Sequence, residues 1–275
     1  MKRAEARRAE TRLLVALDID GTVLHDSGEL SEAVLKQVRR LVARGDEVTI
    51  ATGRSVSSTL PVLDQLGITP EYVVCSNGAI TLRRDAEAPM GYRREFVETF
   101  DPTIVLETIR GHLDDALYAV EDETGFYRYT DAFPENALGL ASERVDFDGL
   151  LGTRVTRVVV ISPDHEVEDF LSVVEQMGLH RVSYNVGWTA WLDIAPDGVN
   201  KATAMERVRD LLGIGTANVV AVGDGRNDIE MLEWAGRHGR GVAMGQAPHE
   251  VIAASSETTA PVTEDGLAKL LATLT

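Results

Sequence analysis

The residues with the clearest chemical potential are two aspartates that follow five consecutive apolar residues, Leu13–Leu17. That apolar run predicts a short strand buried on both faces, and it leads directly into the segment DIDGT, residues 18–22. Side chains at positions i and i+2 point to the same side of a strand, so Asp18 and Asp20 would repel each other if buried. A divalent cation, or a proton on one carboxylate, would remove this conflict. An ordinary Asp-Gly turn after a strand is the alternative interpretation.

Three further polar segments carry groups that suit the same chemistry. They are residues 52–54 (TGR), Lys201, and residues 223–228 (GDGRND). Taken singly, each has an ordinary explanation: glycine-containing segments form turns, Asp228 suits the first turn of a helix, and most lysines are solvated. Two observations favour a specific role for Lys201. The chain contains only four lysines, and this one begins a predicted helix, where the helix dipole disfavours a cation.

These segments lie next to the elements of an alternating α/β pattern. Strands are predicted over 13–17, 47–52, 72–75, 218–222 and 240–244, and helices over 31–41, 57–66, 201–212, 228–235 and 264–274. Ser31 can cap the first helix and Gly45 can end it. The apolar positions of that helix are Val34, Leu35, Val38, Leu41 and Val42.

The positions of the polar residues within this pattern indicate a common site. Strands that alternate with helices at this pace form a parallel sheet, and ligands bind at the carboxyl ends of its strands. Asp18 and Asn77 follow a predicted strand directly or within two residues, and Thr52 is the last residue of another. We therefore expect these side chains to lie at one edge of the sheet.

The pattern changes between about residues 85 and 196. Strand-like pieces over 92–97, 116–122, 126–130, 154–161, 181–186 and 190–195 alternate there with two predicted helices, 102–113 and 165–177, and aromatic residues concentrate there. We therefore expect a Rossmann-like α/β core, a parallel sheet with helices on both faces, made of residues 1–84 and 197–275. A separate α+β domain over 85–196 would be inserted into it. Composition suggests Asp85–Pro89 and Pro196–Gly198 as hinges.

Composition restricts the classes of partner. The chain has 275 residues, 44% hydrophobic and 26% charged, as is ordinary for a globular protein. Its net charge of −17 disfavours nucleic acid and anionic membranes, since both need basic surface. Cys75 is the only cysteine, so an intrachain disulfide is impossible and a reducing compartment fits. The charged first twelve residues lack the apolar stretch of a signal peptide, no apolar run is long enough to span a membrane, and a cytoplasmic location is predicted.

Together, the four polar clusters match the requirements of phosphoryl transfer. One carboxylate can attack phosphorus in line, and a second can protonate the leaving oxygen. Mg²⁺ bound by oxygen ligands would neutralise charge, while a threonine hydroxyl and a lysine ammonium would hold the equatorial oxygens. The sequence thus predicts an enzyme with Mg²⁺ as its cofactor.

The same segments carry a resemblance to a known family. Residues 18–22, Thr52 within ATGR, Lys201, and residues 223–228 occur in the order and at the elements typical of the haloacid dehalogenase-like (HAD) superfamily. The turn over 77–79 (NGA) and the large insertion between the second and third motifs make the chain resemble the Cof-like phosphatases within it, also called the sucrose-phosphate-phosphatase-like group. The resemblance covers nearly all of the chain from about residue 12. It implies a phosphatase that acts on a small phosphorylated metabolite, such as a sugar phosphate, with the insertion as a substrate-specificity cap.

The resemblance also implies a role for each site residue. Asp18 is the expected nucleophile that forms an aspartyl-phosphate, and Asp20 is the expected acid for the leaving alcohol and then the base that activates water. Thr52 and Lys201 are expected to hold phosphoryl oxygens. The expected Mg²⁺ ligands are Asp18, the main-chain carbonyl of Asp20, Asp224 and Asp228. Expected on the phosphate and substrate side are Gly21, Thr22, Gly53, Arg54, Asn77 and Asn227.

Other functions stay open at this point. A phosphomutase or phosphotransferase of the same group would pass the phosphoryl group to a sugar. A receiver-like protein would hold an aspartyl-phosphate without turnover, although receivers are roughly half this length. A binding protein without catalysis is a third alternative. The cap decides the substrate, and its candidate contacts are Glu121, Asp122, Glu123, Tyr127, Arg128, Trp188 and Trp191, although aromatic residues there are more often cap core.

Overall fold

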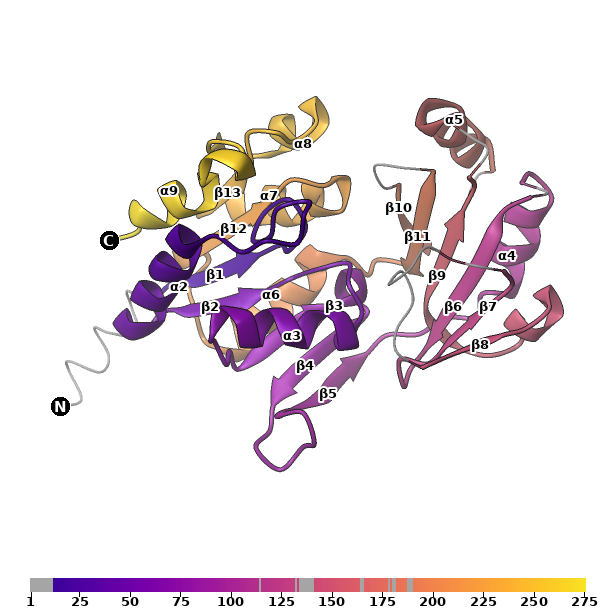
Figure 1. Ribbon diagram of the computed structural model, residues 1–275, viewed down its shortest axis with the longest axis horizontal. Coiled ribbons are helices and arrows are strands. Elements are labelled where there is room, and N and C mark those ends of the chain that lie inside the picture. The colour runs from indigo at the N-terminus through magenta and orange to yellow at the C-terminus, as the bar shows by residue number, and fades with distance from the viewer. Residues whose placement is uncertain are drawn as a thin grey trace.

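The computed structural model describes residues 12–113, 115–131, 133, 141–163, 166–177, 179, 182–186 and 190–275. The charged N-terminal segment up to residue 11 and Trp188 lie outside the described residues. The chain forms a core around a parallel sheet and a second domain around a mostly antiparallel sheet (Figure 1). The predicted fold class, an α/β core with an inserted α+β cap, is confirmed.

The centre of the core is β1 (Leu14–Leu17), the strand that leads into Asp18. It pairs in parallel with β2 (Glu47–Ile50) on one side and with β12 (Val219–Gly223) on the other. β13 (Arg240–Ala243) and β14 (Glu257–Thr258) extend the sheet in parallel beyond β12. The strand order is therefore β14-β13-β12-β1-β2, and the four strands β13, β12, β1 and β2 end on the same side.

Helices cover both faces of this sheet, which explains why β1 is apolar at every position. Val15 and Leu17 of β1 belong to one buried cluster, and Leu14 and Ala16 belong to another on the opposite face. The helices of the first face are α2 (Glu32–Arg44), α3 (Val56–Leu66) and α9 (Gly266–Ala272). Those of the second face are α6 (Lys201–Leu211), α7 (Ile229–Gly236) and α8 (His249–Ala254).

Helix α2 begins and ends where its sequence predicts. The Ser31 hydroxyl accepts a hydrogen bond from the Val34 N–H at 3.2 Å, and Gly45 ends the helix with a φ of 101°, which glycine adopts without strain. The buried stripe is narrower than the apolar pattern indicates. Leu41 is fully buried, whereas the neighbouring Val42 is 42% exposed.

A small antiparallel sheet continues the core beside β2. It consists of β3 (Tyr72–Cys75), β4 (Ile80–Arg84) and β5 (Tyr92–Val97). An isolated parallel bridge between Ala51 and Val74 joins β3 to the end of β2. The end of β3 is thereby brought to the same edge as the ends of β1 and β2.

At this sheet, the structure differs in two details from the predicted insertion. The sequence pattern places the strand over 92–97 in the insertion, but β5 pairs with β4 and therefore extends the sheet on the core side. The hinge predicted at Asp85–Pro89 lies in the β4–β5 hairpin, where the Asp85 N–H donates to the Gly91 carbonyl. It connects two strands of one sheet, so it is not a connection between the domains. The domain limits at 85 and 196 stay a prediction.

The cap is a six-stranded sheet with the order β10-β11-β9-β6-β7-β8. Its strands are β6 (Leu117–Asp122), β7 (Tyr127–Tyr129), β8 (Ser142–Arg144), β9 (Val155–Ile161), β10 (Val182–Val186) and β11 (Trp191–Pro196). Helices α4 (Thr103–Arg110) and α5 (Val167–Met177) pack on one face of this sheet, through residues such as Leu106 and Phe170. Figure 1 shows α4 on the side of the cap that is turned away from the core.

The sequence pattern does not predict several short elements. Strand β8 has three exposed residues, β14 has two residues and α8 has six, so none is long enough to establish a period of two or 3.6. The strand β4 also lacks a predicted counterpart, because it follows the turn over 76–79 directly. Among the residues described, no helix has the length and apolar character needed to cross a membrane.

The different burial of two neighbouring residues on α2 yields a stability prediction. Leu41→Ala removes a fully buried side chain from the core and is expected to lower the free energy of unfolding by about 2–5 kcal/mol. Val42→Ala, one position further on the exposed side, is the matched control and should change it by no more than about 0.5 kcal/mol. Urea unfolding of the two variants measures both values, and equal effects would contradict the burial of this helix.

Candidate active site

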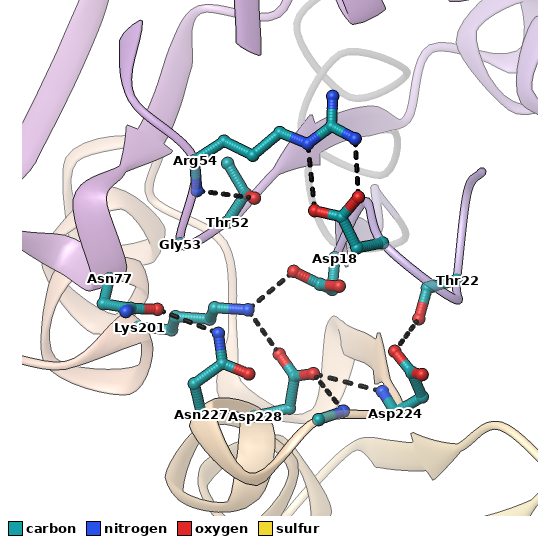
Figure 2. Close-up of polar contacts among 12 residues, drawn as sticks. Asp18, Thr22, Thr52, Gly53, Arg54, Asn77, Lys201, Asp224, Asn227 and Asp228 are labelled. Atoms are coloured by element: carbon teal, nitrogen blue, oxygen red, sulfur yellow. Dashed lines mark hydrogen bonds and ion pairs between the residues drawn. The ribbon is translucent and has the colours of Figure 1, made fainter. Parts of the chain in front are cut away.

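The ends of the core strands bring the predicted site residues together. Asp18 follows β1 and donates its N–H to the Val222 carbonyl of β12 at 3.0 Å, while Thr52 follows β2 and donates its N–H to the Val74 carbonyl of β3 at 3.0 Å. Asp224 follows β12 directly. Asp18, Thr52 and Asp224 are all buried. The expectation that these residues share one edge of the sheet is therefore met (Figure 2).

Lys201 is the centre of this edge. Its Nζ atom donates to Asp18 Oδ1 at 2.6 Å and to Asp228 Oδ1 at 2.7 Å, as Figure 2 shows. The lysine is 1% exposed, so it is neither solvated nor on an outer helix face. Its two carboxylate partners raise the pKa of the ammonium and outweigh the effect of burial, which acts in the opposite direction. Lys201 is thus a buried ammonium that lies between two buried carboxyl groups.

Three carboxylates of the site, those of Asp18, Asp224 and Asp228, could hold a metal ion together. One oxygen from each lies within 4.8 Å of the others, and all three residues are buried. Against their three negative charges stands the single positive charge of Lys201. A hard divalent cation with oxygen ligands would neutralise the remaining two charges, so the donor set fits Mg²⁺.

Burial without such a cation disfavours ionisation of the carboxylates. Burial raises the pKa of Asp18 well above its usual range, opposed by Lys201 and assisted by the neighbouring acids. Burial and the charge of Asp228 raise the pKa of Asp224 from 3.8 to about 7. The site therefore favours a bound cation or proton. The sequence predicts such a conflict between Asp18 and Asp20, whereas in the structure the carboxylates that crowd together are those of Asp18, Asp224 and Asp228.

The carboxylate of Asp20 lies apart from this cluster. Strand pairing of β1 ends at Leu17, and the chain then turns, with the Ile19 carbonyl accepting from the N–H groups of Val23 and Leu24. The alternation that would place both carboxylates on one side of a strand therefore does not apply. The side chain of Asp20 is 65% exposed and pairs with Arg54 through Nε at 2.9 Å and Nη2 at 2.5 Å.

The segment after Asp20 closes tightly around Asp224. The Thr22 hydroxyl donates to Asp224 Oδ1 at 3.3 Å. Gly21 has a φ of 74°, and a Cβ atom there would lie 2.1 Å from Asp224 Oδ2. Only glycine fits this position, both for its backbone conformation and for the space.

The loop over 223–228 is organised by Asp228. Its Oδ2 accepts hydrogen bonds from the N–H groups of Asp224 at 3.1 Å and Gly225 at 3.0 Å, while its other oxygen binds Lys201. A Cβ atom on Gly223 would lie 2.2 Å from the carboxyl carbon of Asp228. These contacts fix the orientation of the Asp228 carboxylate, and the loop places the Asp224 carboxylate close to those of Asp18 and Asp228.

Thr52, Gly53 and Asn77 form the wall of the site beside this loop. The Thr52 hydroxyl accepts from the Arg54 N–H at 3.1 Å, and the Thr52 carbonyl accepts from the Asn77 N–H at 3.0 Å. The Asn77 Oδ1 atom accepts from Asn227 Nδ2 at 2.9 Å. A Cβ on Gly53 would come within 3.3 Å of both amide groups, so the backbone here packs closely against them. The structure places Thr52, Gly53, Asn77 and Asn227 at the site, while the roles of these four residues toward phosphate stay predictions.

Sequence reasoning missed Gln246, which contacts this site from the next strand. Its Nε2 atom donates to the Gly21 carbonyl at 2.6 Å and to Asp224 Oδ2 at 3.2 Å. Gln246 follows β13, so its position after the carboxyl end of a parallel strand was a usable signal. It holds the side chain of Asp224 from the side opposite to Thr22.

Of the predicted cap contacts that the structure describes, Glu121 and Tyr127 are the two that are largely buried. Asp122 accepts from the N–H groups of Thr124 and Phe126 and so stabilises the β6–β7 turn. Glu123 is exposed in the same turn. The Arg128 guanidinium lies 5.9 Å from the ring centre of Phe126. Trp191 packs partly buried against a cap cluster that includes Tyr127 and Ile161.

The raised pKa of Asp224 yields a prediction for stability against pH. A carboxyl group that is protonated more strongly in the folded state stabilises the fold below its unfolded pKa, and this contribution is lost as the pH rises through its folded pKa. For the metal-free protein, the free energy of unfolding is therefore expected to fall between about pH 4 and about pH 7. Mg²⁺ favours the ionised carboxylates, so its stabilising effect should be larger at pH 7.5 than at pH 5. Urea unfolding with EDTA or with Mg²⁺ measures both.

The control for this prediction is Asp224→Asn, which cannot titrate and lacks one anionic ligand. We expect a shallower decline between pH 4 and pH 7 and a smaller stabilisation by Mg²⁺ than in the unmodified protein. Equal stabilisation of both proteins by Mg²⁺ at pH 7.5 would contradict a metal site at Asp224.

The chain is similar to known proteins over nearly its whole length. Residues 15–271 match the family model of the haloacid dehalogenase-like hydrolases. A relative from Bacillus subtilis, the 5-amino-6-(5-phospho-D-ribitylamino)uracil phosphatase YitU, is 30% identical over 94% of this chain and 96% of its own length. The HMP-PP phosphatase of Yersinia enterocolitica is 30% identical over 85% of this chain and 84% of its own length.

A solved structure has the same fold. The HAD subclass IIB sugar phosphatase BT4131 superposes with a TM-score of 0.77 at 21% identity, over 94% of this chain and 98% of the other. The family match agrees with the motifs at the ends of β1, β2 and β12 and at the start of α6. The chain therefore belongs to the haloacid dehalogenase-like hydrolase family, within its Cof-like group of phosphoric monoester hydrolases.

Proposed function

We propose that this chain is a Mg²⁺-dependent phosphatase that hydrolyses a small phosphorylated metabolite through an aspartyl-phosphate on Asp18. The observation that carries the proposal is the buried cluster in which Lys201 bridges Asp18 and Asp228, with Asp224 beside them. Three carboxylates around one ammonium form a site for a divalent cation. The oxygens of a bound phosphoryl group would then be neutralised by the ammonium and the cation together. The inserted cap speaks against a receiver, which is a single domain.

The first half-reaction transfers the phosphoryl group to the protein. A carboxylate oxygen of Asp18 forms a bond to phosphorus while the bond from phosphorus to the leaving oxygen breaks. In this proposal Lys201, which lies at hydrogen-bond distance from Asp18, binds an equatorial phosphoryl oxygen. Thr52 supplies a hydroxyl to the same group, so charge that develops on these oxygens is met by fixed donors.

Asp20 handles the protons of both half-reactions in this proposal. It gives a proton to the leaving alcohol, then takes one from the water whose oxygen attacks phosphorus, and the bond between phosphorus and Asp18 breaks to release phosphate. Its side chain is exposed and, among the contacts described, bound to Arg54. Because the Asp20 side chain lies apart from Asp18, Asp224 and Asp228, its carboxylate is not a ligand of the cation in this proposal.

Mg²⁺ would be held by Asp18, Asp224 and Asp228, with the main-chain carbonyl of Asp20 as a further ligand. When bound, it supplies positive charge against the phosphoryl oxygens. Thr22 and Gln246 hold the carboxylate of Asp224 and therefore orient a ligand oxygen. Gly21 leaves room for that carboxylate.

The names of the relatives support the substrate class that we propose. Relatives are named for a phosphoribitylaminouracil and for HMP-PP, which are small phosphorylated metabolites. We propose the same class here, with no nucleic acid or membrane as partner, since the net charge is −17. A cytoplasmic location is part of the proposal and agrees with the free, buried thiol of Cys75. A panel of sugar phosphates, nucleotides, flavin mononucleotide and pyridoxal phosphate, assayed for phosphate release, tests it.

The nucleophile is tested by Asp18→Asn. The amide cannot attack phosphorus, so Mg²⁺-dependent release of phosphate is expected to fall to the uncatalysed background. Trapping of labelled phosphate on the acid-quenched protein should be lost in parallel. Full metal-dependent turnover by this variant would show that another residue is the nucleophile.

Lys201→Ala tests the electrostatic role of the ammonium. We expect kcat/KM to fall by about 10²-fold or more, as when a fixed donor to a developing oxyanion is removed. Circular dichroism and urea unfolding confirm that the variant is folded, because the lysine also balances buried carboxylates. An unchanged kcat/KM in a folded variant would refute the assignment.

A further inference from the structure

Three charged side chains lie on the face of the cap sheet that meets the core. Glu121 on β6 is directly opposite Arg157 on β9. On the other side of β9, Asp193 of β11 pairs with Val159, which is two residues after Arg157. Each lies in a strand made largely of buried residues. All three are at least nine-tenths buried. Charged residues inside buried strands need partners of opposite charge or strong hydrogen bonds.

The partners of these three residues lie partly in the core. Arg157 donates to Asp193 Oδ1 through Nε at 2.8 Å and to the Gly53 carbonyl through Nη1 at 2.9 Å. Asp193 Oδ2 accepts from Asn77 Nδ2 at 2.8 Å. The Ser76 hydroxyl donates to Glu121 Oε2 at 3.0 Å. We call this set of six residues, three from each domain, the cap–core latch.

The geometry makes the latch specific to one position of the cap. The Arg157–Asp193 pair is internal to the cap, as is a longer contact of 3.4 Å from Arg157 Nη1 to the Tyr127 hydroxyl. The shorter bond of Nη1 to the Gly53 carbonyl and the bond of Asp193 Oδ2 to Asn77 are made with the core. Separation of the domains would leave a guanidinium N–H and a carboxylate oxygen without these partners. Because the groups are buried and charged, loss of such bonds is costly.

The core half of the latch has a strained backbone. Ser76 and Asn77 have φ values of 48° and 51°, a region that side chains other than glycine rarely adopt. Such a conformation persists where the surroundings determine it fully. Here Glu121 and Asp193 bind the side chains of these same two residues. The cap therefore helps to hold the turn after β3 in its conformation.

The latch residues of the core adjoin the groups that the proposed reaction uses. Gly53 follows Thr52, and the loops are joined by hydrogen bonds from the Asn77 N–H to the Thr52 carbonyl and from the Ser76 N–H to the Arg54 carbonyl. Asn77 also accepts from Asn227, the residue before Asp228. A continuous path of hydrogen bonds thus runs from the cap strands to both sides of the site.

We propose that Arg157 and Asp193 are positioning residues that, with Glu121, latch the cap onto the loops of Gly53 and Asn77. In the latched state, Thr52 and the segment Asn227–Asp228 are held in register for phosphoryl transfer. This inference rests on the proposed function, because the alignment it describes serves that reaction. Neither residue touches the reacting atoms, so loss of the latch lowers the fraction of enzyme whose loops are aligned.

The position of the cap can be measured independently of activity. Spin labels at Val42→Cys on α2 and Ile104→Cys on α4 report the distance between the domains, since these positions are 42% and 80% exposed whereas the native Cys75 is buried. The test variant is the double substitution Arg157→Gln/Asp193→Asn. It removes both charges together, so that neither remains buried without its partner. We expect a broader and longer distance distribution than with the native pair.

The matched control is Arg144→Gln/Asp131→Asn. This Arg–Asp pair also belongs to the cap, with 3.1 Å between its atoms, but both side chains are more than half exposed. It should leave the distance distribution and the kinetics unchanged. A comparison of the two double variants therefore separates the latch from any general effect of removing an ion pair from the cap.

The kinetic test uses p-nitrophenyl phosphate with Mg²⁺ well below the unfolding temperature. For Arg157→Gln/Asp193→Asn we expect kcat to fall about tenfold or more with a small change in KM, because loop alignment is needed for reaction more than for binding. Arg157→Lys keeps the charge but cannot make both bonds, so it should recover part of kcat. A role confined to folding would lower stability and leave kcat unchanged.

The outcomes distinguish this inference from the proposed function. If the native protein hydrolyses no phosphate monoester, the proposed function fails, and the distance measurement alone decides whether the latch exists. A native-like distance distribution in the double latch variant overturns the latch. A longer distance with kcat within about twofold of the native value overturns its positioning role.

Discussion

The structure of this protein depends on one buried contact, in which Lys201 lies between Asp18 and Asp228. The side chain of the lysine is fully buried, so it exists as an ammonium only because two carboxylates surround it. The carboxylates in turn depend on the lysine, since their own burial disfavours the charged form. One cation does not balance three anions, so the same contact leaves a buried group of three carboxylates that could hold a metal ion.

This requirement governs the local backbone. The carboxylates must approach one another closely, so the chain passes them where side chains would collide, at Gly21 beside Asp224 and at Gly223 beside Asp228. Donors that approach from other strands, Thr22 and Gln246, then fix the direction of the Asp224 oxygens. The parallel sheet makes this possible, because the ends of β1, β2, β12 and β13 meet at one edge. The convergence of these polar groups is thus a property of the sheet edge, and the cap sheet contacts the loops beside it.

The cap solves a related problem at its contact with the core. Its sheet carries charges within apolar strands, and these charges find partners in the turns after β2 and β3. Contact between the domains is therefore polar and directional, and it involves residues next to Thr52 and Asn227. A contact of this kind has one favourable geometry, in contrast to an apolar surface that tolerates sliding. In the proposed latch, the charged residues of the cap sheet therefore contact the loops that adjoin the site.

The sequence by itself determined the α/β core, the buried central strand, the cap of α+β type, and the segments that end at the site. Each of these follows from local periodicity or from a short motif, as for the apolar run before Asp18 and the cap of α2 at Ser31. The pairing of Asp20 with Arg54, the placement of β5 with the core, the contact of Gln246 and the cap–core latch were decided only by the tertiary structure. The physical reason is that these contacts join groups far apart in the chain, such as Arg157 and Gly53 at a separation of 104 residues. Periodicity shows which residues of a strand are buried, but only the packed loops and strands decide which charge meets which partner.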